Sequence, residues 1–206
     1  MLVEKQVYLV DDDAAVCHAL SVFLTSSAYS VDTFSCAEDF LEAASDEMEG
    51  VMLLDQRMTG MTGLELQEKL GDCGVELPII FITGHGDVRM SVKAIKAGAV
   101  NFLEKPFSNE ELLKALSEAF AYADEDKKRH NEIAELKRCY ASLTARESEV
   151  MQYVVAGMSN RGLADQLGVS DRTIEVHRAR GMKKMEAESL PDLVRKYTLC
   201  KQGGVL

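Results

Sequence analysis

Long hydrophobic runs are missing from this sequence of 206 residues, whose apolar stretches span only a few residues each. A membrane-spanning helix needs about 20 apolar residues, and no charged N-terminal flank precedes a cleavable apolar segment. The five cysteines lack metal-binding spacing and are odd in number, which is typical of reduced thiols in an intracellular chain. We therefore expect a cytoplasmic protein with neither a membrane span nor a signal peptide.

Basic side chains are scarce in the first part of the chain and frequent in the last. Residues 1–123 hold 8 basic and 21 acidic residues, residues 124–141 hold 5 of each, and residues 142–206 hold 10 and 8. The length, with 47% apolar and 28% charged residues, indicates a globular chain of two domains. The acidic part is consistent with a metal and phosphoryl site, and the mildly basic part with a nucleic-acid module.

Short apolar runs alternate with segments of helical spacing up to about residue 122. The runs, each followed by a helical pattern, are residues 7–10, 30–34, 51–54, 78–82 and 100–103. This alternation predicts an α/β, doubly wound, five-stranded parallel sheet with helices on both faces.

Three carboxylates follow two of these runs directly. Asp11 and Asp12 come after residues 7–10, and Asp55 comes after residues 51–54. Because the carboxyl ends of parallel strands meet at one edge of the sheet, we expect these side chains to converge there. A cluster of like charges needs a divalent metal or a shared proton, and carboxylate oxygens suit Mg²⁺. Such a site could receive a phosphoryl group.

The rest of the chain is predicted to be helical. Residues 123–141 are polar, with Ile133, Leu136 and Tyr140 at helical spacing, so we expect a linker helix that can continue the preceding helix. A solvated spacer is favoured over a pairing with a partner helix, because two turns are too few for a coiled coil. Residues 142–206 show no strand pattern and form four helical segments, with predicted caps at Thr144 with Glu147, at Ser170 or Asp171, and at Ser189 with Asp192.

Four short motifs within residues 5–122 together resemble the receiver domain of two-component response regulators. They are Val10-Asp11-Asp12-Asp13, Asp55-Gln56-Arg57-Met58-Thr59-Gly60, Thr83-Gly84 and Lys105-Pro106-Phe107. Each motif alone is weak, since acidic pairs and Lys-Pro steps are common in loops. The resemblance implies a receiver domain at residues 1–122 with a flavodoxin-like sheet of strand order 2-1-3-4-5.

The same resemblance assigns roles to the clustered residues. Asp55 would accept phosphate from a phosphohistidine of a sensor kinase, and Mg²⁺ would be held by Asp12, Asp55 and the backbone carbonyl of Arg57, with Asp11 acting through water. The peptide bond between Lys105 and Pro106 is expected to be cis. The Lys105 ammonium would neutralise the phosphoryl oxygens, as phosphoryl transfer requires.

Two further receiver residues would couple the phosphoryl group to the surface. The Thr83 hydroxyl would follow the phosphoryl oxygen, and Phe102 would turn inward, which reshapes residues 87–104. Ordinary core packing is the alternative for Phe102.

The sequence departs from the usual Met-Pro-Gly at Thr59, so we expect a more flexible loop and a modest effect on rate or phosphoryl lifetime. Asp13 is expected to be a solvated helix cap.

A second set of motifs, in residues 143–200, resembles the LuxR-type helix-turn-helix of the NarL/FixJ subfamily. The motifs are residues 143–147, 157–160, 163–164, 167–170 and 173–177. A short helix, a glycine-containing turn and a second helix rich in arginine and lysine also form the arrangement that enters a major groove.

In the predicted recognition helix, about Asp171 to Glu186, Ile174, Met182 and Met185 would face the core. The residues expected toward the bases are Thr173, Glu175, Val176 and Ala179. Those expected to contact phosphates are Asn160, Arg161, Arg172, His177, Arg180, Lys183 and Lys184. A plain solvated role is the alternative for each basic residue.

Two glycines depart from the helix-turn-helix pattern. Gly162 and Gly181 should each cost roughly 0.5 to 1 kcal/mol relative to alanine, so the recognition helix could fray beyond Arg180. In the last helix, Leu190 to Leu199, the resemblance implies a dimer contact that includes Leu193, Val194 and Tyr197, with core packing as the alternative.

Taken together, these patterns predict a transcriptional regulator that phosphorylation controls. Its partners would be a sensor histidine kinase, promoter DNA and a second copy of the chain bound through residues 87–104, and contact with RNA polymerase stays open. Apart from phosphotransfer to its own Asp55, no enzymatic activity is expected. Two alternatives remain: an Mg²⁺-dependent aspartyl phosphatase, disfavoured because Arg57 stands where a second acid is needed, and a receiver that never takes phosphate.

Overall fold

The computed structural model describes residues 5–84 and 88–204. The chain divides into two compact units between residues 126 and 127, and each is described by itself. Within the described residues, no helix combines the length and the apolar character that crossing a membrane requires.

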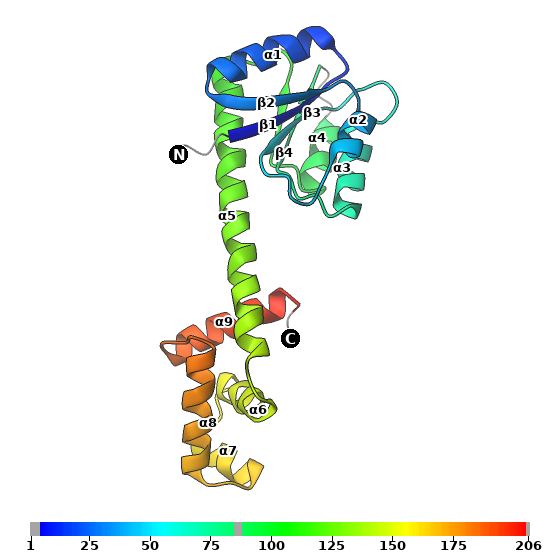
Figure 1. The fold of residues 1–206 in the computed structure, drawn as a ribbon. Helices are drawn as coiled ribbons and strands as arrows, with labels where there is room; N and C mark the ends of the chain where they lie inside the picture. The colour runs from blue at the N-terminus through cyan, green and yellow to red at the C-terminus, as the bar shows by residue number, and fades with distance from the viewer. Residues whose placement is uncertain (1–4, 85–87, 205–206) are drawn as a thin grey trace. The chain divides into compact units, whose positions relative to one another are not determined.

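The first unit is built on a five-stranded parallel sheet of order β2-β1-β3-β4-β5, as predicted (Figure 1). The strands are β1 (Lys5–Val10), β2 (Tyr29–Phe34), β3 (Val51–Asp55), β4 (Ile79–Thr83) and β5 (Asn101–Glu104). Each lies within one or two residues of its predicted run. The central strands β3 and β4 are buried along their whole length, which explains their continuous apolar sequence.

Helices cover both faces of this sheet because side chains alternate along each strand. In β1, Val7 and Leu9 belong to a core cluster that includes residues of α1 (Ala14–Ser26) and α5 (Asn109–Ala141). Tyr8 and Val10 belong to a second cluster, with residues of α2 (Ala37–Ala43), α3 (Gly63–Asp72) and α4 (Val88–Lys96). The doubly wound architecture is therefore confirmed.

The helix that follows β1 begins at once and fixes the acidic turn before it. The Asp13 carboxylate accepts hydrogen bonds from the backbone N–H groups of Ala15 and Val16, and so caps α1. This confirms the predicted cap and leaves Asp11 and Asp12 in the turn at the carboxyl edge of the sheet.

Helix α5 runs without interruption from Asn109 to Ala141, so the predicted continuity with the linker is confirmed. The predicted solvated spacer is wrong for the second half of residues 123–141. Leu136 and Cys139 are buried in the core of the second unit, with Tyr140 packed against it. The three-and-four spacing of apolar residues marked a face that packs on the C-terminal helices rather than a solvated one.

The second unit adds α6 (Ala145–Val155), α7 (Asn160–Leu167), α8 (Asp171–Lys184) and α9 (Leu190–Gln202). A hydroxyl side chain caps each of these helices at its N-terminus, and Thr144 with Glu147 forms the predicted capping box. Gly168 ends α7 with a φ of +64°, a left-handed conformation that glycine adopts without a steric penalty. Thus the predicted all-helical module is confirmed.

Candidate functional site

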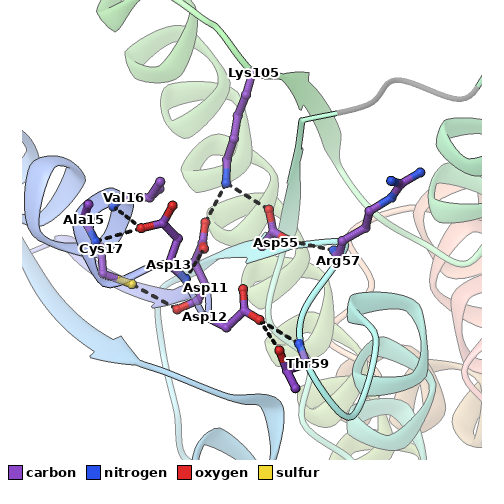
Figure 2. A network of polar contacts seen from close by, with 10 residues as sticks. All are labelled: Asp11, Asp12, Asp13, Ala15, Val16, Cys17, Asp55, Arg57, Thr59 and Lys105. Atoms are coloured by element: carbon purple, nitrogen blue, oxygen red, sulfur yellow. Dashed lines mark hydrogen bonds and ion pairs between the residues drawn. The ribbon is translucent and has the colours of Figure 1, made fainter.

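The ends of β1, β3 and β5 bring the predicted charged residues together (Figure 2). The Lys105 ammonium donates to Asp11 Oδ2 at 2.7 Å and to Asp55 Oδ1 at 2.9 Å. Its peptide bond to Pro106 is cis, as predicted. The backbone N–H of Lys105 donates to the Thr83 carbonyl at 2.7 Å, which fixes the start of this loop against the end of β4.

Asp55 is 5% exposed, and each of its carboxylate oxygens has a partner. Oδ1 accepts from Lys105, while Oδ2 accepts from the backbone N–H of Arg57 at 2.6 Å. Burial raises the pKa of Asp55 despite these bonds. Burial alone would lower the pKa of Lys105, but its bonds to Asp11 and Asp55 outweigh that effect and raise it. The site therefore keeps a buried carboxylate beside a retained positive charge.

Asp12 lies at the same edge but is exposed and has a different partner. Its Oδ2 accepts from the Thr59 backbone N–H at 2.7 Å and from Thr59 Oγ1 at 2.8 Å (Figure 2). These bonds lower the pKa of Asp12, the backbone bond most strongly. The N–H that replaces proline at Thr59 is thus bound to Asp12, and the more flexible loop stays a prediction.

The residues present fit a magnesium ion by the chemistry of their donors. Asp11, Asp12 and Asp55 offer carboxylate oxygens, and the single ammonium of Lys105 leaves an excess of negative charge for a divalent cation to offset. A cavity of about 460 Å³ adjoins Asp11 and Asp12 and reaches toward α1 and β2. Asp55 and Lys105 are not among its lining residues, so the cavity lies beside Asp11 and Asp12 only.

The two predicted switch residues lie on neighbouring strands. Thr83 is fully buried at the end of β4, and Phe102, paired in register with Phe81, packs partly buried against the sheet core. Core packing thus accounts for the Phe102 ring, and its switching role stays a prediction. Of the segment 87–104, residue 87 lies outside the described residues.

The predicted recognition helix is α8, which ends at Lys184 rather than near Glu186. Ile174 and Met185 are fully buried and Met182 packs partly against the same core, so the inward face is confirmed. Thr173 lies half-buried in the first turn. The opposite face exposes six of the residues predicted to contact DNA: Arg172, Glu175, Val176, Ala179, Arg180 and Lys183.

Comparison with known proteins agrees with both halves of the chain. Residues 7–117 match the family model of the response regulator receiver domain, and residues 141–197 match that of the bacterial regulatory proteins of the luxR family. The chain is a response regulator.

Similar proteins align over nearly the whole length of this response regulator. The response regulator protein TmoT of Ectopseudomonas mendocina is 46% identical over 192 residues, which cover 93% of this chain and 87% of TmoT. The transcriptional regulatory protein FixJ of Rhizobium meliloti is 41% identical over 194 residues, which cover 94% of this chain and 95% of FixJ. Among solved structures, that of response regulator StyR is 40% identical in sequence and has a TM-score of 0.79. The match covers 95% of this chain and 98% of the StyR chain. The chain is thus a two-component transcriptional regulator with a LuxR-type DNA-binding domain.

Lys184 has a structural partner in this response regulator. Its ammonium lies 2.6 Å from Glu147 Oε2 and 2.9 Å from the Ser142 carbonyl. Glu147 is 3% exposed, and its hydrogen bond from Lys184 and its capping bonds with Thr144 lower its pKa from 4.5 to about 2. In this structure the side chain joins the end of α8 to the start of α6, and the phosphate contact predicted for Lys184 stays a prediction.

Two other predicted phosphate contacts have local constraints as well. Asn160 Oδ1 accepts from Arg178 Nη1 at 2.9 Å, which orients the amide at the start of α7. His177 is half-buried, and its Nδ1 is buried without a hydrogen-bond partner. Arg161 is exposed, and its side chain makes no hydrogen bond to the other described residues.

Gly181 lies where α8 packs closely against α6. A Cβ atom there would lie 2.8 to 2.9 Å from three side-chain atoms of the fully buried Met151, and α8 continues past this residue to Lys184. The predicted fraying beyond Arg180 is therefore wrong.

In α9, Leu193 and Tyr197 are buried and follow the core alternative, whereas Val194 is exposed.

Sequence reasoning missed three partners of site residues. Thr59 could have been found, because replacing proline with threonine adds two donors next to an acidic cluster. Glu147 as the partner of Lys184, and Arg178 as the partner of Asn160, lie 37 and 18 residues away in the sequence. No local pattern indicates pairs so widely separated.

Proposed function

We propose that Asp55 accepts a phosphoryl group from a phosphohistidine of a sensor histidine kinase. The observation that carries this proposal is the buried Asp55 carboxylate held between the Lys105 ammonium and the Arg57 N–H. An Asp55 oxygen would form the new bond to phosphorus while the bond from phosphorus to the histidine nitrogen breaks, and that nitrogen keeps the bonding electron pair. Lys105 would remain in place to neutralise the phosphoryl oxygens.

Magnesium would be held by Asp12, Asp55 and the backbone carbonyl of Arg57, with Asp11 acting through water. When bound, the ion would cancel negative charge on the transferring group. The two donors fixed on Asp55 orient the carboxylate before the phosphoryl group arrives, so little reorganisation is needed during transfer. The chain would modify only itself and turn over no other substrate.

Phosphorylation would then act on the far edge of the sheet. Thr83 and Phe102 lie on adjacent strands, and a shift of the buried Thr83 hydroxyl toward the phosphoryl group would open room for the ring. Residues 87–104 would change shape and pair two copies of the chain. Val92 and Ile95 of α4, which are 47% and 49% exposed, supply apolar surface for that contact.

A dimer would place two recognition helices on adjacent half-sites of promoter DNA in the cytoplasm. Joining two weakly binding modules raises their affinity through effective concentration, so dimerisation alone can serve as the switch. On α8, Glu175 would accept from a cytosine amine, and Val176 or Ala179 would contact a thymine methyl group. Arg172, Arg180 and Lys183 would contact phosphates.

The proposal is tested by mass spectrometry of the full chain after treatment with acetyl phosphate and Mg²⁺. We expect one phosphoryl adduct, absent in Asp55→Asn and kept in the matched control Asp13→Asn, because Asp13 caps α1. An adduct that persists in Asp55→Asn, or no adduct on the unaltered chain, would contradict the assignment. Rapid hydrolysis of added phosphoesters would support a phosphatase instead.

A further inference from the structure

The loop between β3 and α3 directs two backbone N–H groups at two different carboxylates. Arg57 donates to Asp55, and Thr59 donates to Asp12 (Figure 2). The residue between them, Met58, is 7% exposed and packs into the sheet core. Two fixed residues therefore precede the Thr59 N–H: Arg57 through its hydrogen bond to Asp55, and Met58 through its packing in the core.

Thr59 adds its hydroxyl to this contact. Oγ1 and the backbone N–H both donate to Oδ2 of Asp12, at 2.8 and 2.7 Å, and Oδ1 takes neither bond. One threonine thus fixes the direction of an exposed carboxylate and leaves its second oxygen for another ligand. Proline at this position would supply neither donor.

We infer that Thr59 is a positioning residue that holds Asp12 ready to bind Mg²⁺ through Oδ1. This inference rests on the proposed function of the acidic site. An exposed aspartate otherwise loses side-chain freedom when it binds a metal, and outer hydrogen bonds remove that cost by orienting the ligand beforehand. The opposite effect, competition between Thr59 and the metal for Asp12, would give tighter metal binding when the donors are removed.

The test is the Kd for Mg²⁺ of the unphosphorylated full chain, measured by isothermal titration calorimetry. Thr59→Val keeps the shape and the N–H but loses the hydroxyl, and we expect binding weaker by on the order of 10-fold, a typical effect of removing an outer-shell partner. Thr59→Pro loses both donors and should bind more weakly still. Thr59→Ser should bind like the unaltered chain, as should the distant control Thr25→Val.

Magnesium binding by Thr59→Val that is equal to or tighter than that of the unaltered chain would overturn this inference and leave the proposed function intact. An unaltered chain that binds no Mg²⁺ would overturn both. A second readout is the Thr59 amide signal in ¹H–¹⁵N NMR spectra. This signal should shift in Asp12→Asn. When Mg²⁺ is added to the unaltered chain, the signal should keep the chemical shift of a hydrogen-bonded amide. Loss of that chemical shift on metal binding would show competition.

Discussion

Gly181→Ala tests whether close packing or helix propensity decides the stability of the second unit. In a helix interior, alanine is favoured over glycine by roughly 0.5 to 1 kcal/mol. Here the new Cβ would lie 2.8 to 2.9 Å from Met151 Sδ, Cε and Cγ, and Met151 is fully buried. Overpacking a core by one methyl group costs typically about 1 to 3 kcal/mol. The steric cost is the larger, so we expect a net loss of about 1 kcal/mol.

Gly162→Ala is the matched control in the same unit. Its Cβ would lie 3.4 Å from Met158 Cγ and Ser159 Oγ, which is ordinary contact distance, so only the propensity gain remains. We expect this variant to be more stable by a few tenths of a kcal/mol, because Gly162 lies in the first turn of α7.

Calorimetric unfolding of the full chain measures both variants through the transition of the second unit. For a unit of this size, 1 kcal/mol corresponds to a Tm change of about 4 to 8 °C. Gly181→Ala should lower Tm, and the loss should shrink in a Met151→Ala background, where the clash is absent. A Gly181→Ala variant as stable as Gly162→Ala, or an undiminished loss beside Met151→Ala, would refute the packing argument.

Two further predictions concern the pair formed by Lys184 and Glu147. The folded pKa of Glu147 is lowered from 4.5 to about 2, so its stabilising effect is fully present above pH 4.5 and is lost as the pH falls toward 2. The Tm of the second unit should therefore fall more steeply over this range in the unaltered chain than in Glu147→Gln; equal slopes would contradict the pairing. On DNA, Lys183→Ala should reduce the slope of log K against log salt concentration by about 0.9, as expected for one lost phosphate contact, whereas Lys184→Gln should leave it unchanged. A reduced slope for Lys184→Gln would instead support its predicted role as a phosphate contact.

The parallel sheet followed from the sequence because each relevant signal is local or is repeated at every strand, whereas the strand order was implied by the resemblance to receiver domains. Five apolar runs of strand length, separated by helical spacing, allow few topologies other than a parallel sheet with crossover helices. The caps at Asp13, Thr144 and Ser170 are also local, since each side chain bonds to an N–H two or three residues away. The second half of the linker differed because the same spacing fits a solvated face and a buried one, and only contact with α6 to α9 decides between them.

Within the site, the sequence indicated which residues meet but not how their charges are shared. Convergence of Asp11 and Asp55 follows from the ends of parallel strands, whereas the resemblance to receiver domains placed Lys105 beside them. The partners of Asp12 and Lys184 depend on the path of a loop and the closeness of two helices, which are set by tertiary packing. At Thr59 and Gly181, where the sequence analysis expected a cost, the structure shows a close contact. The N–H gained at Thr59 binds Asp12, and the absence of a side chain at Gly181 lets α8 approach Met151. A departure from a family pattern is therefore best examined by asking which neighbour contacts the changed atom. At Gly181 the intrinsic cost of glycine is smaller than the steric cost expected from an added Cβ.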